Sequence, residues 1–150
     1  MRIIVDADAC PVKDIIERTA KRFGIDVIMF VDENHILFSD YSRIVTVSQG
    51  KDAVDIAAAN NTAAGDIVVT QDYGVASLAL GKGAYAIGMS GLIYDDNNID
   101  KLMFERFLRQ KCRNSRTHKG KLKNTKKRTN EDDTKFEQNL IRLIKREIQQ

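Results

Sequence analysis

The chain has 150 residues, of which 43% are hydrophobic, so it is long enough for one globular domain with a single core and too short for a second. No apolar run approaches the roughly 20 residues that span a bilayer, and the first residues lack the pattern of a signal peptide, so we expect a cytoplasmic protein without membrane contact. The formal net charge is +3, and the two cysteines, far apart and without a CxxC partner, argue against a zinc or disulfide framework.

The N-terminal segment predicts a buried strand followed directly by a helix. Residues 1–5 are a short apolar run, and two aspartates, Asp6 and Asp8, follow where the strand should end. Pro11 suits the first turn of a helix, apolar residues then recur at helical spacing through Phe23, and Gly24 provides the stop. The sequence therefore places two carboxylates at the junction between a strand and a helix.

The middle of the chain continues this alternation of strands and helices. The predicted strands cover residues 25–31, 43–47, 67–70 and 84–88, and the predicted helices cover residues 52–64 and 75–80. Strands that alternate with helices at this spacing are typical of an α/β fold, in which a mostly parallel central sheet has helices on both faces.

The C-terminal third changes in character. Apolar residues at helical spacing begin at Ile99 and predict a helix with one apolar face. A polar, strongly basic stretch follows it. Helical order returns near Thr134, which has capping-box spacing to Glu137. We therefore expect an α/β domain over residues 1–108, a flexible basic segment over residues 109–130, and an amphipathic helix over residues 131–150. That helix is expected to dock on the domain or on a second copy of the chain, which would make a homo-oligomer.

Aspartates occur at the ends of several predicted elements. They are Asp6 and Asp8 after the first strand, Asp52 and Asp55 at the start of the second helix, Asp72 after the strand over residues 67–70, and the pair Asp95 and Asp96. Ligands bind in open α/β sheets at the carboxyl ends of the strands, and carboxylates gathered there repel one another unless a cation neutralises them. The cluster Asp6, Asp8, Asp52, Asp55 and Asp72 therefore predicts a site for Mg²⁺ or Mn²⁺.

Each of these aspartates also has a purely structural interpretation. Asp8 is placed to cap the helix at Pro11, and Asp52 is a good N-cap after Gly50, which favours Asp55 as the ligand that points inward. Asp72 follows a strand that should be buried, where an unpaired carboxylate would be costly. The pair Asp95 and Asp96 fits a loop and helix cap better than a site.

The basic segment is the strongest charge feature of the chain. Residues 109–128 contain ten lysines and arginines and no acidic residue, which leaves 14 basic residues against 21 acidic ones elsewhere, a net charge near −7. A phosphate backbone is a natural partner for such a segment, although a solvated linker is the simpler alternative. The residues predicted to contact nucleic acid are Lys13, Thr70, Arg113, Arg116, Lys119, Lys121, Lys123, Lys126, Lys127 and Arg128.

Four segments resemble the YaiI/YqxD family of bacterial proteins. They are DADACPVK at residues 6–13, GKDAVD at 50–55, GDIVVTQDYG at 65–74 and NNID at 97–100. The resemblance covers nearly the whole chain and implies a PIN-like fold, because the family is grouped with PIN-like nucleases. It also implies that Asp6, Asp72, and either Asp52 or Asp55 bind a divalent metal. Two features differ from the usual PIN pattern: Asp8 is an added carboxylate, and no glutamate clearly fills the position between the first and middle aspartates.

These observations predict a nuclease that hydrolyses phosphodiesters with Mg²⁺ or Mn²⁺ at the aspartates Asp6, Asp8, Asp55 and Asp72. The resemblance favours RNA over DNA as the substrate. One alternative is a haloacid-dehalogenase-like phosphatase with Asp6 as the nucleophile and Asp8 as the acid and base. Another is a PIN-like protein that binds nucleic acid without cutting it.

Overall fold

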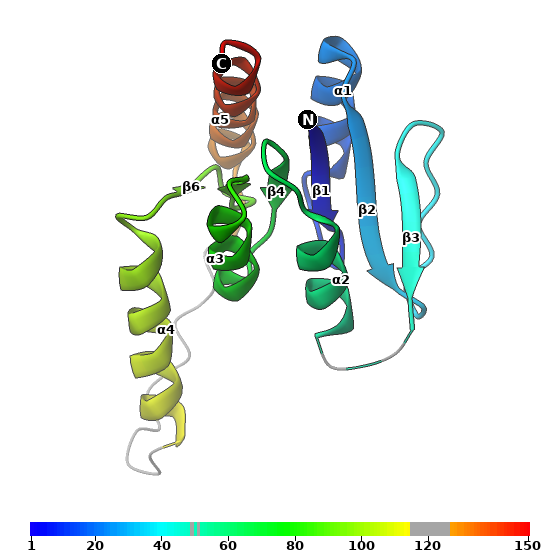
Figure 1. Cartoon of the computed structure of the whole chain (residues 1–150). Helices are drawn as coiled ribbons and strands as arrows, with labels where there is room; N and C mark the ends of the chain where they lie inside the picture. The colour runs from blue at the N-terminus through cyan, green and yellow to red at the C-terminus, as the bar shows by residue number, and fades with distance from the viewer. Residues whose placement is uncertain (49, 51, 115–126) are drawn as a thin grey trace.

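The computed structural model describes residues 1–48, 50, 52–114 and 127–150. Within them, one sheet contains the strands β1 (Arg2–Asp6), β2 (Asp26–Asp32), β3 (Arg43–Val47), β4 (Ile67–Val69), β5 (Tyr85–Ile87) and β6 (Ile93–Tyr94). The helices are α1 (Lys13–Phe23), α2 (Ala53–Asn61), α3 (Tyr73–Gly81), α4 (Ile99–Asn114) and α5 (Asn130–Ile148). Figure 1 shows their arrangement.

The strand order across the sheet is β3-β2-β1-β4-β5-β6. All neighbouring strands run parallel except β5 and β6, which pair in the antiparallel sense. The predicted α/β fold with a mostly parallel sheet is thus confirmed. The edge strand β6 was not predicted, because two residues carry too little periodic pattern to indicate a strand.

The two faces of the sheet bury separate apolar clusters, as predicted. One cluster contains side chains of β1 such as Ile3 and Val5 together with α1 and four fully buried residues of α5, which are Phe136, Leu140, Leu143 and Ile144. The other contains Ile4 and Val68 together with residues of α2 and α3. Alternate side chains of one strand point to opposite faces, which is why Ile3 and Ile4 belong to different clusters.

Three predicted boundaries were wrong in detail. Helix α1 begins at Lys13, and Pro11 lies in the preceding turn. Helix α2 ends at Asn61 instead of residue 64, because Thr62 has an extended backbone. Helix α5 begins at Asn130, where Thr129 and Asp132 form the capping box predicted for Thr134 and Glu137. The reciprocal bonds of Thr129 and Asp132 fix the start of the helix one turn earlier.

The turn between β5 and β6 depends on Gly91, which has φ +93°. A Cβ atom at this position would lie 2.8 Å from the backbone nitrogen of Phe136 in α5. We expect Gly91→Ala to lower the free energy of unfolding by about 2 kcal/mol, because it combines a strained φ with a clash against a backbone that is held in the core.

Gly24→Ala is the matched control for Gly91→Ala. Gly24 also has a positive φ of +67°, but no atom lies within 4 Å of the position that a Cβ atom would take there. It should therefore show the conformational cost alone, about 1 kcal/mol. Urea denaturation of both variants measures the difference, and equal losses would mean that α5 does not pack tightly over Gly91.

Candidate metal centre

The sheet order brings the ends of β1 and β4 together at the point where the chain reverses its direction across the sheet. From β1 the chain proceeds to β2 and β3, and then returns to place β4 on the other side of β1. Such a reversal leaves a crevice outside the carboxyl ends of the two central strands, where ligands bind in open α/β sheets. Asp6 is the last residue of β1, and Thr70 and Asp72 follow β4.

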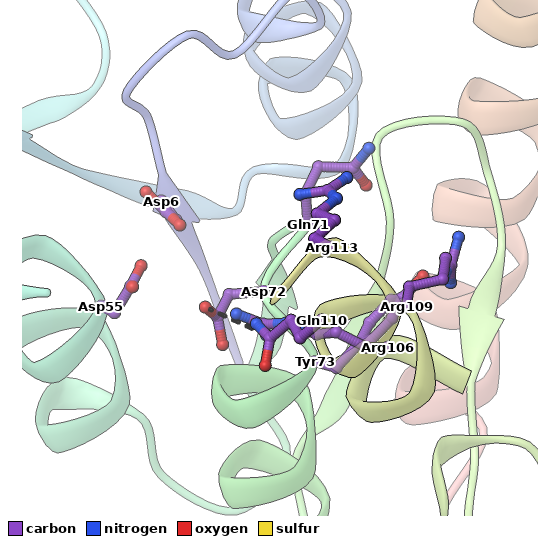
Figure 2. A pocket seen from close by; sticks show the side chains of 9 residues that line it. All are labelled: Asp6, Asp55, Gln71, Asp72, Tyr73, Arg106, Arg109, Gln110 and Arg113. Carbon is purple, nitrogen blue, oxygen red and sulfur yellow. Dashed lines mark ion pairs between the residues drawn. The ribbon is translucent and has the colours of Figure 1, made fainter. Parts of the chain in front are cut away.

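Asp6 and Asp55 face each other across this crevice (Figure 2). Burial raises the pKa of Asp6 to about 7, and the interaction with the carboxyl group of Asp55 and the charges of Asp55 and Asp8 act in the same direction. Burial also raises the pKa of Asp55, with contributions from the charges of Asp72, Asp52 and Asp8. Burial and the neighbouring charges therefore disfavour the ionised form of both carboxyl groups, as is usual for closely spaced carboxylates.

Thr70 connects Asp6 to the segment after β4. Its side chain is fully buried, and its hydroxyl donates to Oδ2 of Asp6 at 3.4 Å. The hydroxyl oxygen of Thr70 also accepts from the backbone nitrogen of Asp72 at 3.0 Å. The prediction that Thr70 contacts nucleic acid stays untested, and in this structure its side chain has no exposed surface. Its role in the structure is to orient Asp6.

Asp72 is the N-cap of α3. Its Oδ1 accepts from the backbone nitrogen of Val75 at 3.0 Å, and its Oδ2 lies 3.8 Å from Nη1 of Arg106. The hydrogen bond to Val75 fixes the carboxylate at the rim of the crevice and leaves Oδ2 directed away from the helix backbone. Asp72 thus caps α3 with one carboxylate oxygen and also lines the candidate site.

Neither Asp8 nor Asp52 acts as the helix cap that the sequence also allowed. Asp8 accepts instead from the backbone nitrogen of Asp32 at 3.3 Å, and α1 has no side-chain cap bond. Asp52 precedes α2 without a side-chain cap bond and has φ +64°. Asp6, Asp8, Asp32, Asp52 and Asp55 line one hollow of about 280 Å³. Five carboxylates around so small a space create a strong negative potential.

Two residues of the acidic region were missed in the sequence, Asp32 and His35. Nδ1 of His35 lies 3.1 Å from Oδ1 of Asp32 and 3.4 Å from Oδ1 of Asp8. In the described ranges, Asp8, Asp32 and His35 form the one group of three such residues whose ligand atoms all lie within 4.8 Å of one another. The sequence did contain an indication for Asp32, because this residue is the last of β2, just as Asp6 is the last of β1.

Backbone hydrogen bonds also shape this second group. The backbone nitrogen of Asn34 donates to Asp32 and, together with His35, lowers the pKa of that carboxyl group. Asp6, Asp55 and Asp72 are spaced more widely than Asp8, Asp32 and His35, since they do not meet the same 4.8 Å limit in the described residues. They line a shared cleft without surrounding a single point.

The main cleft has an acidic wall and a cationic wall. It measures about 540 Å³ and is lined on one side by Asp6, Asp55 and Asp72, and on the other by residues of α4 that include Arg106, Arg109 and Arg113 (Figure 2). Of these arginines, the sequence prediction named Arg113 alone as a contact with nucleic acid. Arg109 was part of the predicted basic segment but was not assigned to the site, and Arg106 belongs to the helix predicted from Ile99, for which the sequence indicated only an apolar seam.

The remaining predicted basic contacts have different positions. Lys13 is half-buried at the start of α1 and does not line the main cleft, whereas Lys127 is exposed. Arg128 donates from Nε to Asp133 at 2.6 Å, so this carboxylate already accompanies its charge, and a contact with phosphate stays a prediction. Arg116, Lys119, Lys121, Lys123 and Lys126 lie outside the described residues.

The arrangement gives little support to a phosphatase with Asp6 as nucleophile. A phosphatase of this kind would also need a lysine beside its aspartates, but Lys82 donates from Nζ to the backbone oxygens of Ala59 and Thr62, at 2.6 and 3.3 Å, at the end of α2. Asp95 and Asp96 line a different hollow, and Asp95 accepts from the backbone nitrogens of Asn97 and Asn98 as a loop cap. A protonated Asp6 would also be a poor nucleophile.

Comparison with known proteins adds a family but no solved relative. Residues 4–146 match the family model described as "Uncharacterized BCR, YaiI/YqxD family". A UPF0178 protein of Lachnoclostridium phytofermentans is 54% identical over 145 residues, which cover 97% of each chain. A UPF0178 protein of Ruminiclostridium cellulolyticum is 52% identical over 147 residues, which cover 98% of this chain and 94% of the other. No solved structure matches. Among the described residues, no helix is both long and apolar enough to cross a membrane.

Proposed function

The chain belongs to the YaiI/YqxD family, and from that premise and its cleft we propose that it is a metal-dependent, PIN-like nuclease that hydrolyses phosphodiester bonds. The observation that carries the proposal is the position of Asp6, Asp55 and Asp72 opposite a row of arginines in one cleft. A metal-bridged phosphodiester needs both an acidic and a cationic wall. The family analogy favours RNA over DNA.

The donor set fits a hard divalent cation. Carboxylate oxygens are the ligands that Mg²⁺ and Mn²⁺ prefer, and a cation would relieve the repulsion between carboxylates that helps to raise the pKa of Asp6. Asp6, Asp55 and Asp72 would hold the ion or ions, and Asp8 and Asp52 would add negative charge from the neighbouring hollow. When bound, the metal would polarise a phosphoryl oxygen and lower the pKa of a water molecule.

The residues of the chain would perform the remaining tasks. Thr70 holds one oxygen of Asp6 through its buried hydroxyl, and the N-cap bond to Val75 holds one oxygen of Asp72. Fixed carboxylates keep the reacting groups in line without reorganisation during the reaction. Arg106 stands beside Asp72, where it would meet the negative charge that develops on a phosphoryl group.

A nuclease assay with a labelled RNA oligonucleotide tests this function. We expect cleavage in Mn²⁺ and none in EDTA, with products that end in phosphate and hydroxyl groups. Matched DNA should be cut more slowly. RNA that is bound but never cut in Mg²⁺ or Mn²⁺ would contradict the proposal and leave the chain as a non-catalytic binding protein.

The basic segment should add affinity that does not depend on sequence. If about five of its charges meet phosphates of a single strand, log K should fall against log[salt] with a slope of about −3.5. The double variant Lys126→Gln/Lys127→Gln should flatten this slope by about 1.4. Arg128 is left out of the variant because Asp133 already pairs with it.

Fluorescence anisotropy with an RNA oligonucleotide across a salt series measures these slopes. The control is Lys21→Gln/Lys145→Gln, which removes the same charge from the last turns of α1 and α5. We expect the control to keep the parent slope. Equal slopes in all three proteins would make the basic segment a solvated linker.

A further inference from the structure

The face of α4 that borders the cleft is a cationic row. Arg106, Arg109 and Arg113 are spaced three and four residues apart, so they occupy one side of the helix, and all three line the cleft opposite the aspartates (Figure 2). The side chain of Arg106 is 48% exposed although it pairs with Asp72. In the part of the chain that the structure describes, neither Arg109 nor Arg113 forms an ion pair with a carboxylate.

The three arginines of this row carry more positive charge than the single carboxylate paired with them, that of Asp72, can neutralise. One guanidinium is enough to accompany Asp72, and three exposed guanidiniums side by side repel one another. Arginine forks match the oxygens of phosphate in a bidentate way, so a row of them at helical spacing suits successive phosphates of a chain. The charge pattern therefore points to an anionic ligand that extends along α4.

Tyr73 supplies an aromatic surface in the same cleft. It follows Asp72 directly, opens α3 and is half-buried, and it lines the cleft together with the arginines. The buried ring of Tyr94 meets it edge to face, with 5.9 Å between the ring centroids. That contact holds the Tyr73 ring in place, and a fixed aromatic ring beside a cationic row is the arrangement on which unpaired bases stack.

We propose that α4 and Tyr73 together form a binding site for one strand of nucleic acid with an unpaired base. Arg106, Arg109 and Arg113 hold the phosphates, the base stacks on Tyr73, and the strand is thereby laid along the carboxylates of Asp6, Asp55 and Asp72. The binding role stands on the geometry of this wall, whereas the cutting of the bound strand rests on the proposed function.

The cleft selects a single strand over a duplex for two reasons. Its volume of about 540 Å³ is that of a pocket for a small organic ligand, which fits one or two nucleotides. A base reaches Tyr73 only when it leaves its stack, which costs a few kcal/mol in a duplex and little in a single strand. An acidic peptide would bring carboxylates against Asp6 and Asp55 and offers no base to Tyr73.

Two exposed lysines that lie outside both the cleft and the basic segment provide a matched control. They are Lys101 near the start of α4 and Lys145 in the last turn of α5. The variant Arg109→Gln/Arg113→Gln removes two charges from the cleft, and Lys101→Gln/Lys145→Gln removes two charges from elsewhere on the surface. Both keep Arg106 and its contact with Asp72.

The test is fluorescence anisotropy of a labelled single-stranded RNA oligonucleotide in EDTA, where metal-dependent cleavage is stopped. We expect the Kd to rise at least about tenfold in Arg109→Gln/Arg113→Gln and less than about twofold in Lys101→Gln/Lys145→Gln. Tyr73→Leu should weaken the single strand about tenfold and leave duplex binding unchanged, and Tyr73→Phe should restore parent affinity. Thermal melts of each variant separate loss of the site from loss of the fold.

Several results would overturn the inference. They are equal affinity of the two double variants, parent affinity in a folded Tyr73→Leu, tighter binding of duplex than of single strand, and displacement of the oligonucleotide by an acidic peptide at similar concentration. If the single strand binds as expected but Mn²⁺ produces no cleavage, the binding site stands and the proposed nuclease function fails.

Discussion

Asp6→Asn is expected to lower Mn²⁺-dependent cleavage of RNA by about a thousandfold. Asp6 faces Asp55 across the crevice, and the hydroxyl of Thr70 orients its carboxyl group. An asparagine keeps the shape of the side chain but loses the charge that a metal ion needs. The loss should appear in kcat, because the metal stabilises charge that develops during the reaction.

The same substitution should not weaken the fold of the metal-free protein. Burial and the charges of Asp55 and Asp8 disfavour ionised Asp6, so removing its charge relieves repulsion. Asp26→Asn is the matched control, because Asp26 is exposed and begins β2 at the opposite end of the sheet. Single-turnover cleavage and a melt in EDTA measure both effects. A control variant that loses as much activity, or an Asp6→Asn protein that melts well below the parent, would contradict the assignment.

The affinity for Mn²⁺ is expected to rise about a hundredfold between about pH 5 and pH 7. The pKa of Asp6 is raised to about 7, so below that pH the carboxyl group holds a proton that must leave before the metal binds. One proton released per ion corresponds to about tenfold in affinity for each pH unit. Above the pKa of Asp6 the affinity should level off.

The raised pKa of Asp6 also determines whether the stability of the fold rises or falls with pH. The unfolded carboxyl group loses its proton near its ordinary pKa of 3.8, whereas the folded one keeps it until about pH 7. The contribution of Asp6 to the stability of the metal-free fold is therefore fully present below about pH 4 and is lost as the pH rises to about 7.

Isothermal titration calorimetry at several pH values tests the proton release directly. The number of protons released per Mn²⁺ ion follows from titrations in two buffers with different heats of ionisation. Asp6→Asn should show weak binding with no steep dependence on pH. A parent affinity that is constant from about pH 5 to 7 would mean that Asp6 is not a ligand.

Local sequence patterns predicted the strands and helices well where apolar periodicity was strong. Residues 43–47 were assigned as a strand with the observed bounds, and the amphipathic helix predicted over residues 131–150 buries Phe136, Leu140, Leu143 and Ile144. The carboxyl ends of β1 and β4 were expected to carry the site because a parallel sheet gathers those ends at one edge. Asp6 and Asp72 lie at that edge.

Features that depend on distant contacts could not be predicted. Lys82 donates to backbone oxygens at the end of α2, and no local sequence pattern predicts these contacts. The grouping of Asp8, Asp32 and His35 depends on the pairing of β1 with β2, since Asp32 is far from Asp8 in sequence. The cationic wall was predicted only in part, because the helix was expected to end near residue 108, whereas α4 continues to Asn114 and aligns Arg113 with Arg106 and Arg109.

Anomalous scattering from a crystal soaked in Mn²⁺ tests the central claim most directly, because it locates the ion without reference to activity. We predict anomalous density within bonding distance of the carboxylates of Asp6 and Asp55, on the side of the cleft that faces Asp72 and Arg106. Density at Asp8, Asp32 and His35 alone, or none at any of these carboxylates, would contradict a metal centre at the carboxyl ends of β1 and β4.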